Sequence, residues 1–218
     1  MSAEMSEGAT VVAERLNTQL SQVGLEALDP VLVHRFEDYL SLILRWNSRI
    51  NLTAIRDQEG ILSRHFVESI ACARALPAGI ATLLDYGSGA GFPGIPIALC
   101  CPEISVTLAE SQGKKAAFLQ EAIRILGISC KVLAQRAELQ AAQFDCVTLR
   151  AVERMQLAVQ AAAQLVRPGG WLALMTTRAE IARLQVEAGD PFTWPNVVPL
   201  PGEDLVLALG ERSTGSPV

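Results

Sequence analysis

Three glycines at alternate positions constrain this chain more than any other feature of its sequence. Gly87, Gly89 and Gly91 follow residues 81–86, a short and mostly apolar run. Such a run is typical of a central parallel strand that is covered on both faces. The glycines allow a turn with positive φ and let a ligand approach main-chain amides without a Cβ in the way. The sequence therefore predicts a strand, a glycine turn and a helix, with a cofactor bound at the turn.

A strand-end carboxylate follows the turn at the spacing that nucleoside-binding folds use. Residues 104–109 are expected to form the next strand, which ends in Glu110, about twenty residues past the first glycine. In doubly wound folds an acid at this place accepts hydrogen bonds from ribose hydroxyls. Asp85, at the carboxyl end of the first strand, is expected to direct an acceptor into the same crevice. A bare turn without a ligand is the alternative, but it would not need these two carboxylates.

The glycine spacing distinguishes between two classes of cofactor. A dinucleotide site has the pattern Gly-x-Gly-x-x-Gly, whose third glycine lets helix and strand close over a pyrophosphate. This chain has Phe92 at that position. Its own pattern, Gly-x-Gly-x-Gly, fits the loop that binds S-adenosylmethionine, where no phosphate is held. The sequence therefore favours S-adenosylmethionine over a nicotinamide dinucleotide.

Beyond residue 76, strand patterns alternate with helix patterns, which predicts an α/β fold with a mostly parallel sheet. Strands are expected at residues 81–86, 104–109, 128–134, 144–149, 171–175, 194–198 and 204–209. Before this region, apolar residues have helical spacing in three segments, 10–23, 30–46 and 58–75. We therefore expect an N-terminal helical extension, residues 1–76, and a Rossmann-like core, residues 77–218, within one compact domain.

Ligands of open α/β sheets bind beyond the carboxyl ends of the strands, where the strand order reverses. Four strand ends of this chain would meet there. They carry Asp85, Glu110 with Ser111, Ala137 with Glu138, and Arg150. The functional groups of these residues are therefore expected on one rim.

Composition argues against several other classes of protein. Only two histidines are present, and the five cysteines show no Cys-x-x-Cys spacing, so neither a metal site nor a disulfide framework is indicated. No uninterrupted apolar run reaches about eighteen residues, and the N-terminus has no apolar run of signal length. The net charge of −5 disfavours binding of nucleic acid through bulk charge. We expect a cytoplasmic protein with no metal and no membrane association.

Motifs between residue 46 and about residue 170 resemble those of a known family. They are Trp46-Asn47-x-x-x-Asn51-Leu52-Thr53, Arg64-His65-Phe66-x-Glu68-Ser69, the run from Asp85 to Pro96, Glu110-Ser111-x-Gly113-Lys114 and Arg136-Ala137-Glu138. The continuation of the glycine turn into Phe-Pro-Gly-Ile-Pro is specific to that family. The chain thereby resembles the RsmG family, also called GidB, the guanine-N7 methyltransferases of bacterial small-subunit ribosomal RNA.

The resemblance implies a class I methyltransferase fold with an N-terminal helical cap and S-adenosylmethionine as the cofactor. It implies that the methyl acceptor is N7 of a guanosine in the 530 loop of 16S ribosomal RNA, position 527. The residues expected to contact the cofactor are Asp85, Gly87, Ser88, Gly89, Gly91, Phe92, Glu110, Ser111, Ala137, Glu138 and Arg150. The chain departs from the family at Met175-Thr176-Thr177, where the family commonly has Lys-Gly.

The chemistry of guanine N7 limits what the protein must supply. N7 carries an in-plane lone pair, so methyl transfer to it needs no general base and depends on alignment of the reactants. Arg150 is the catalytic candidate, with the role of orienting the base through O6. In A-form RNA the major groove is too narrow for side chains, so the target base is expected in a loop or splayed out.

The resemblance also directs attention to side chains that could touch RNA. The candidates are Arg49, Asn51, Arg56, His65, Lys114 and Arg154. His65 could equally be a core histidine bonded to a backbone carbonyl, and Asn51 a cap or turn residue. With a net charge of −5, tight binding is expected to need 16S ribosomal RNA within the small subunit or its precursor, and the protein is expected to be a monomer.

Three other functions remain open on the sequence alone. A methyltransferase acting on a small molecule would use the same loop, with the helical extension as a lid. A nicotinamide-dependent oxidoreductase is disfavoured by Phe92. A binding module that has kept the fold and lost its activity is the third.

Overall fold

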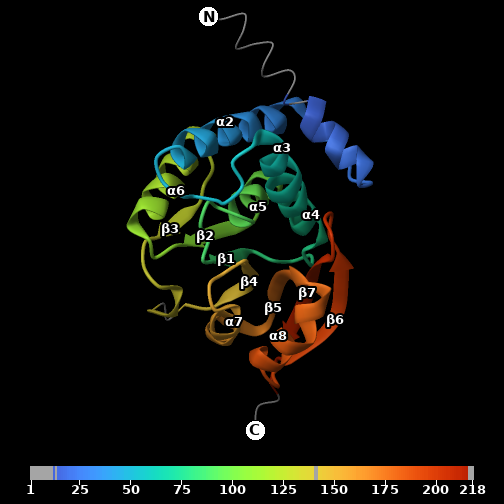
Figure 1. Cartoon of the computed structure of the whole chain (residues 1–218). Helices are drawn as coiled ribbons and strands as arrows, with labels where there is room; N and C mark the ends of the chain where they lie inside the picture. Colours follow the sequence, from blue (N-terminus) through green and yellow to red (C-terminus); the bar gives the residue numbers. More distant parts are fainter. Residues whose placement is uncertain (1–11, 13, 140–141, 216–218) are drawn as a thin grey trace, which may run out of the picture.

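A seven-stranded sheet lies at the centre of the protein, and its strand order is β3-β2-β1-β4-β5-β7-β6. The computed structural model describes residues 12, 14–139 and 142–215 (Figure 1). The strands are β1 (Thr82–Tyr86), β2 (Ser105–Ala109), β3 (Lys131–Leu133), β4 (Phe144–Arg150), β5 (Val166–Thr177), β6 (Phe192–Pro199) and β7 (Leu205–Arg212). β1 to β5 run parallel, whereas β7 is antiparallel to both β5 and β6. The prediction of a seven-stranded, mostly parallel sheet is therefore confirmed, and the strand order reverses between β1 and β4.

Helices cover both faces of this sheet (Figure 1). The main ones are α2 (Pro30–Asn47), α4 (Glu68–Ala75), α5 (Gly94–Cys100), α6 (Gly113–Leu126), α7 (Met155–Gln164) and α8 (Ile181–Ala188). One apolar core joins the sheet to α2, α4, α5 and α6, and a second joins it to α7 and α8. Among the described residues, no helix is both long enough and apolar enough to span a bilayer.

Local chemistry sets several helix ends where the sequence predicts them. The side chain of Asp29 caps α2 by accepting hydrogen bonds from the main-chain N–H groups of Val31 and Leu32, at 2.9 and 3.0 Å. α6 ends at Gly127, which has φ +61°. The helix before α2 is described at 14–22 and stops before Gly24, which has φ +74°. Its predicted start at residue 10 lies outside the described residues.

Other boundaries differ from the expected ones. The third N-terminal helix consists of three consecutive segments, α3 (Gln58–Gly60), the π-helix η1 (Ile61–Val67) and α4. β5 begins at Val166 rather than residue 171, because Val166 already pairs with Phe144 of β4. α7 begins only at Met155, because the preceding residue, Arg154, has φ +53°, which is incompatible with a right-handed helix. β3 is also shorter than expected.

The N-terminal helices share their apolar core with the sheet. Phe36 and Ile43 of α2 and Ile70 of α4 are fully buried in the same cluster as residues of β1 and β2. One compact domain accounts for this packing. A division into residues 1–76 and 77–218 stays a prediction.

Candidate active site

The glycine turn has the backbone conformation that its sequence predicts. Gly87, Gly89 and Gly91 have φ of +72°, +56° and +91°. At Gly91 a Cβ would lie 2.5 Å from Cδ1 of Ile95 and 2.6 Å from Oη of Tyr39. Only glycine fits there, because the position combines positive φ with close neighbours. The turn carries the chain from the end of β1 into α5.

Glu110, at the end of β2, holds the turn through both carboxylate oxygens. Its Oε2 accepts a hydrogen bond from the main-chain N–H of Gly89 at 3.0 Å, and its Oε1 accepts one from Gln112 at 2.7 Å. The side chain also lines the cavity described below. Because each carboxylate oxygen has two lone pairs, Glu110 can support the turn and still accept hydrogen bonds from a ligand hydroxyl.

Asp85 lies beneath the turn rather than in the crevice. It is 1% exposed, and it accepts hydrogen bonds from Gly94 N at 3.1 Å and from Thr148 Oγ1 at 3.0 Å. Pro93 occupies the N-cap of α5, and Gly94, the first residue of the helix, supplies the N–H that Asp85 binds. Burial raises the pKa of Asp85 to about 6, although these hydrogen bonds lower it. The expectation that Asp85 points into the crevice is therefore wrong, and its carboxylate supports the loop.

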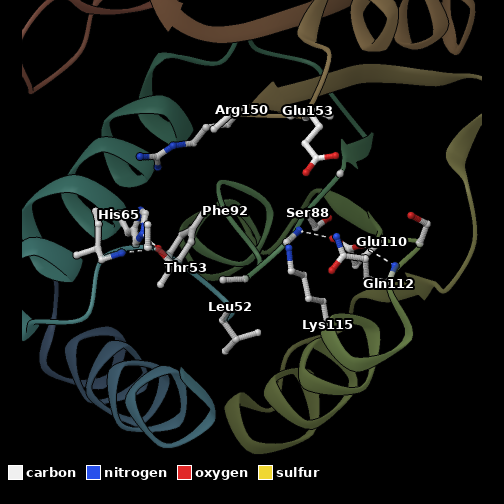
Figure 2. A pocket seen from close by; sticks show the side chains of 18 of the residues that line it. Leu52, Thr53, His65, Ser88, Phe92, Glu110, Gln112, Lys115, Arg150 and Glu153 are labelled. Atoms are coloured by element: carbon white, nitrogen blue, oxygen red, sulfur yellow. Dashed lines mark hydrogen bonds between the residues drawn. The ribbon is translucent and has the colours of Figure 1, made fainter. Parts of the chain in front are cut away.

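A cavity of about 620 Å³ opens above the glycine turn (Figure 2). This volume lies within the range of small-molecule and cofactor sites. Among the predicted cofactor residues, Gly87, Ser88, Gly89, Phe92, Glu110, Ser111 and Arg150 line it. Asp85, Gly91, Ala137 and Glu138 do not line it. Lining residues that the predicted set lacked include Thr53, Lys115, Val152 and Glu153.

Ala137 and Glu138 lie in the short 3₁₀ helix η2 (Ala137–Leu139). Ala137 is buried, and Glu138 accepts a hydrogen bond from the hydroxyl of Tyr86 at the end of β1. Burial and the Glu138 carboxylate both raise the pKa of Tyr86. The contact joins the carboxyl end of β1 to the segment that follows β3.

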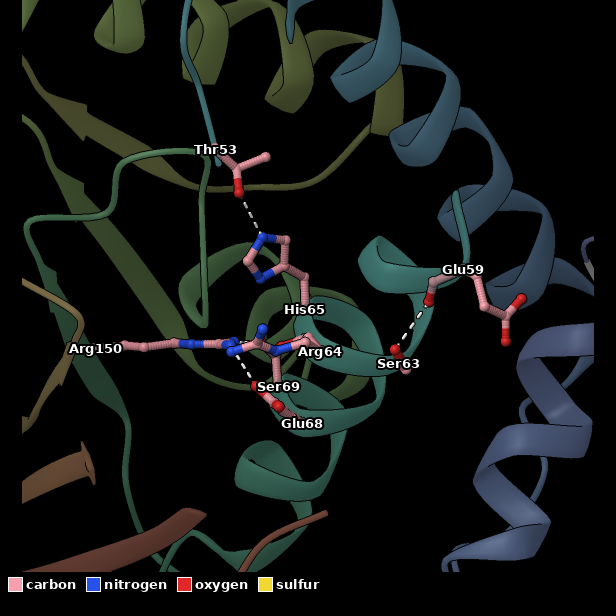
Figure 3. Close-up of polar contacts among 8 residues, drawn as sticks. All are labelled: Thr53, Glu59, Ser63, Arg64, His65, Glu68, Ser69 and Arg150. Carbon is pink, nitrogen blue, oxygen red and sulfur yellow. Dashed lines mark hydrogen bonds and ion pairs between the residues drawn. The ribbon is translucent and has the colours of Figure 1, made fainter. Parts of the chain in front are cut away.

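Arg150 ends β4, and its guanidinium reaches across to the N-terminal helices (Figure 3). Nη1 donates to Oγ of Ser69 at 3.1 Å, while Nη2 donates to the main-chain oxygen of Arg64 and forms an ion pair with Oε2 of Glu68. Burial lowers the pKa of Arg150, and Glu68 raises it again. These contacts fix the guanidinium at the wall of the cavity before any ligand binds.

His65 lies in the π-helix η1 and lines the same cavity. Its Nε2 lies 2.7 Å from Oγ1 of Thr53 (Figure 3). Its ring stacks on Phe92 with centroids 4.5 Å apart. Burial, together with the charges of Arg150 and Arg64, lowers its pKa to about 3. His65 is therefore a neutral wall residue that is hydrogen-bonded to the hydroxyl of Thr53.

The other candidate RNA residues are exposed and do not line the cavity. Asn51 accepts a hydrogen bond from Nη2 of Arg56 at 2.9 Å, in the loop whose residues 52–55 line the cavity. Lys114 precedes the lining residue Lys115, and Arg154 follows the lining residue Glu153. Arg49 lies in the turn after α2. Among the described residues no cluster of His, Cys, Asp or Glu could hold a metal ion.

Solved structures support the fold. The predicted O-methyltransferase Atu636 from Agrobacterium tumefaciens superimposes with a TM-score of 0.57 at 18% identity, over 66% of this chain and 80% of that one. TrmN from Thermus thermophilus superimposes with a TM-score of 0.56 at 22% identity, over 69% of this chain and 53% of that one. The architecture is therefore the class I methyltransferase fold.

Sequence relatives establish the family. The ribosomal RNA small subunit methyltransferase G of Stenotrophomonas maltophilia (strain K279a) is 41% identical over 197 residues, which covers 85% of this chain and 90% of that protein. The protein of the same name from Halorhodospira halophila is 40% identical over 191 residues, 84% of this chain and 90% of that protein. The sequence model of the GidB family, rRNA small subunit methyltransferase G, matches residues 32–190. The chain therefore belongs to this family of S-adenosylmethionine-dependent methyltransferases.

Proposed function

We propose that the protein methylates N7 of a guanosine in the 530 loop of 16S ribosomal RNA. The substrate is the RNA within the small ribosomal subunit or its precursor, and the protein acts in the cytoplasm as a monomer. The observation that carries the proposal is the cavity above the glycine turn, with Glu110 at one side and the fixed guanidinium of Arg150 at the other.

The residues of this cavity fit S-adenosylmethionine. The glycines leave open a cradle beside main-chain amides, and a Cβ at Gly87 would come within 3.1 Å of Val152. Glu110 offers a carboxylate for ribose hydroxyls. His65 is neutral at physiological pH, so it adds no positive charge to a cavity that receives a sulfonium. When bound, S-adenosylmethionine supplies the methyl group, whose bond to sulfur breaks as the N7 lone pair forms the new N–C bond.

The protein's contribution to this reaction is alignment rather than proton transfer. N7 needs no deprotonation before attack, and Asp85 is hydrogen-bonded beneath the glycine turn while His65 is hydrogen-bonded in the cavity wall. Alignment of reactants can supply about 7 kcal/mol or more of a barrier. Arg150 would orient the base by donating to O6, as arginine does with guanine.

The charge distribution favours a substrate that presents several surfaces. The net charge is −5, yet the exposed basic residues Arg56, Lys114 and Arg154 are each next in sequence to a residue that lines the cavity. Such a rim gives local attraction to phosphates without strong binding of free RNA. An assembled subunit would add further contacts to the same rim.

The test compares substrates directly. Purified protein and methyl-labelled S-adenosylmethionine are incubated with small subunits, protein-free 16S RNA, large-subunit RNA and a metabolite extract. Mass spectrometry of nucleosides should find 7-methylguanosine at one position of 16S RNA, formed faster in subunits. Label in another nucleoside, or only in a metabolite, would refute the proposal. Sedimentation analysis should show a monomer.

A further inference from the structure

A second cavity, of about 700 Å³, lies beside the first, beyond the carboxyl ends of β4 and β5. The two cavities share Arg64, Arg150 and Ala151. Met155 and Met175 supply apolar wall, and the residues of the β6–β7 turn close the far side. Arg150 therefore stands on the boundary between the two cavities.

Glu68 supplies this second cavity with a carboxylate that is fixed but only partly used. Its side chain is 7% exposed, and Oε2 forms the ion pair with Arg150. Among the described residues, Oε1 has no hydrogen-bond partner. It faces the β6–β7 turn, where a Cβ at Gly202 would lie 3.0 Å from it, and both Glu68 and Gly202 line the cavity. A pre-oriented acceptor is thus held next to a pre-oriented donor.

The order of these groups matches the order of groups on guanine. Along one side of that base stand N7, the O6 acceptor, the N1–H donor and the N2–H₂ donor. Along the protein wall stand the cofactor cavity, the Arg150 donor and the Glu68 acceptor. Adenine does not match, because it has an amino group in place of O6 and no hydrogen on N1.

We propose that the second cavity receives the target guanine and that Glu68 determines base specificity by accepting hydrogen bonds from N1–H and N2–H₂. Arg150 then lies against O6, and N7 faces the cofactor cavity. This inference rests on the proposed function and adds to it a residue that selects the base. Discrimination by a carboxylate is strong, because hydrogen bonds to charged groups contribute more than those between neutral groups.

The test uses inosine, which keeps N7, O6 and N1–H but lacks the 2-amino group. Small subunits are assembled on 16S RNA that carries either guanosine or inosine at the methylated position, and kcat/KM is measured for both. The wild-type protein should prefer guanosine by roughly tenfold to a hundredfold, as expected for a hydrogen bond to a charged acceptor. In Glu68→Gln, which keeps an oxygen for Arg150 but carries no charge, the preference should fall by more than about threefold.

The matched control is Glu103→Gln, which makes the same change at an exposed residue before β2, at the opposite edge of the sheet. It should leave the preference unchanged. A purely structural role for Glu68 would slow both substrates equally, and a preference that falls by less than about threefold would overturn the inference. If Glu68→Gln does not fold, the same threshold applies to Glu68→Asp, which withdraws the oxygens by one methylene. A wild-type protein that forms no 7-methylguanosine would instead refute the proposed function itself.

Discussion

Replacing Gly91 by alanine tests whether the glycine turn is shaped by packing as well as by backbone freedom. The residue has φ +91°, and an added Cβ would lie 2.5 Å from Ile95 Cδ1 and 2.6 Å from Tyr39 Oη. Positive φ costs an L-residue about 1–2 kcal/mol. Forcing a carbon into a packed core costs about 1–3 kcal/mol more. Gly91→Ala should therefore lower the free energy of unfolding by about 2–5 kcal/mol.

The matched control is Gly79→Ala, because Gly79 has φ +85° and nothing lies within 4 Å of its added Cβ. In this variant the free energy of unfolding should fall only by the cost of positive φ, about 1–2 kcal/mol. For a domain of this size each kcal/mol lowers Tm by about 2–4 °C. Urea and thermal unfolding measure both variants, and calorimetry with S-adenosylmethionine should show weaker binding for Gly91→Ala alone. Equal losses of stability in the two variants would refute the packing argument.

Three further predictions concern titration and cofactor binding. The pKa of Asp85 is raised from 3.8 to about 6, so its contribution to stability is present below about pH 4 and is lost as the pH rises through about 6. Over this range the free energy of unfolding of the wild-type protein should fall by about 3 kcal/mol more than that of Asp85→Asn. Urea unfolding at a series of pH values measures this difference. His65, with a pKa of about 3, should keep a neutral ring in nitrogen NMR spectra at mildly acidic pH, and titration of its ring near pH 6 would contradict its burial. In Glu110→Gln the amide nitrogen cannot accept the hydrogen bond that Oε2 of Glu110 accepts from the N–H of Gly89. Calorimetry should therefore find that this variant binds S-adenosylmethionine about tenfold to a hundredfold more weakly. The control variant Glu103→Gln should bind it as the wild-type protein does.

Elements whose ends depend on local chemistry could be predicted from the sequence. Asp29 caps α2, and Gly127 ends α6, because capping involves only residues a few positions apart. The π-helix η1 could not be predicted, since π-helices are rare and its seven residues are too few to show a distinct apolar period. The start of α7 depended on the positive φ of Arg154, a conformation that non-glycine residues adopt too rarely to expect.

The candidate site divides in the same way. The glycine turn and Glu110 could be found because they follow their strands directly. The pair of Glu68 and Arg150 joins residues 82 positions apart, and the contact of Asp85 with Thr148 joins residues 63 apart. No local pattern reports such pairs, because they exist only once the sheet has brought β1 and β4 side by side and η1 and α4 have packed against them.

The aromatic residues around Phe92 join the N-terminal helices to the glycine turn. Phe92 packs against Tyr39 of α2 at 5.4 Å, against His65 at 4.5 Å and against Phe66 at 5.9 Å between ring centroids. The hydroxyl of Tyr39 also donates a hydrogen bond to the main-chain oxygen of Ala90, inside the turn itself. The turn is thus held by β2 through a carboxylate and by α2 and η1 through aromatic rings. A lid that opened by moving α2 away would break these contacts and release the turn. We therefore expect ligands to enter past residues 52–55, which line the cavity, with the helices staying in place.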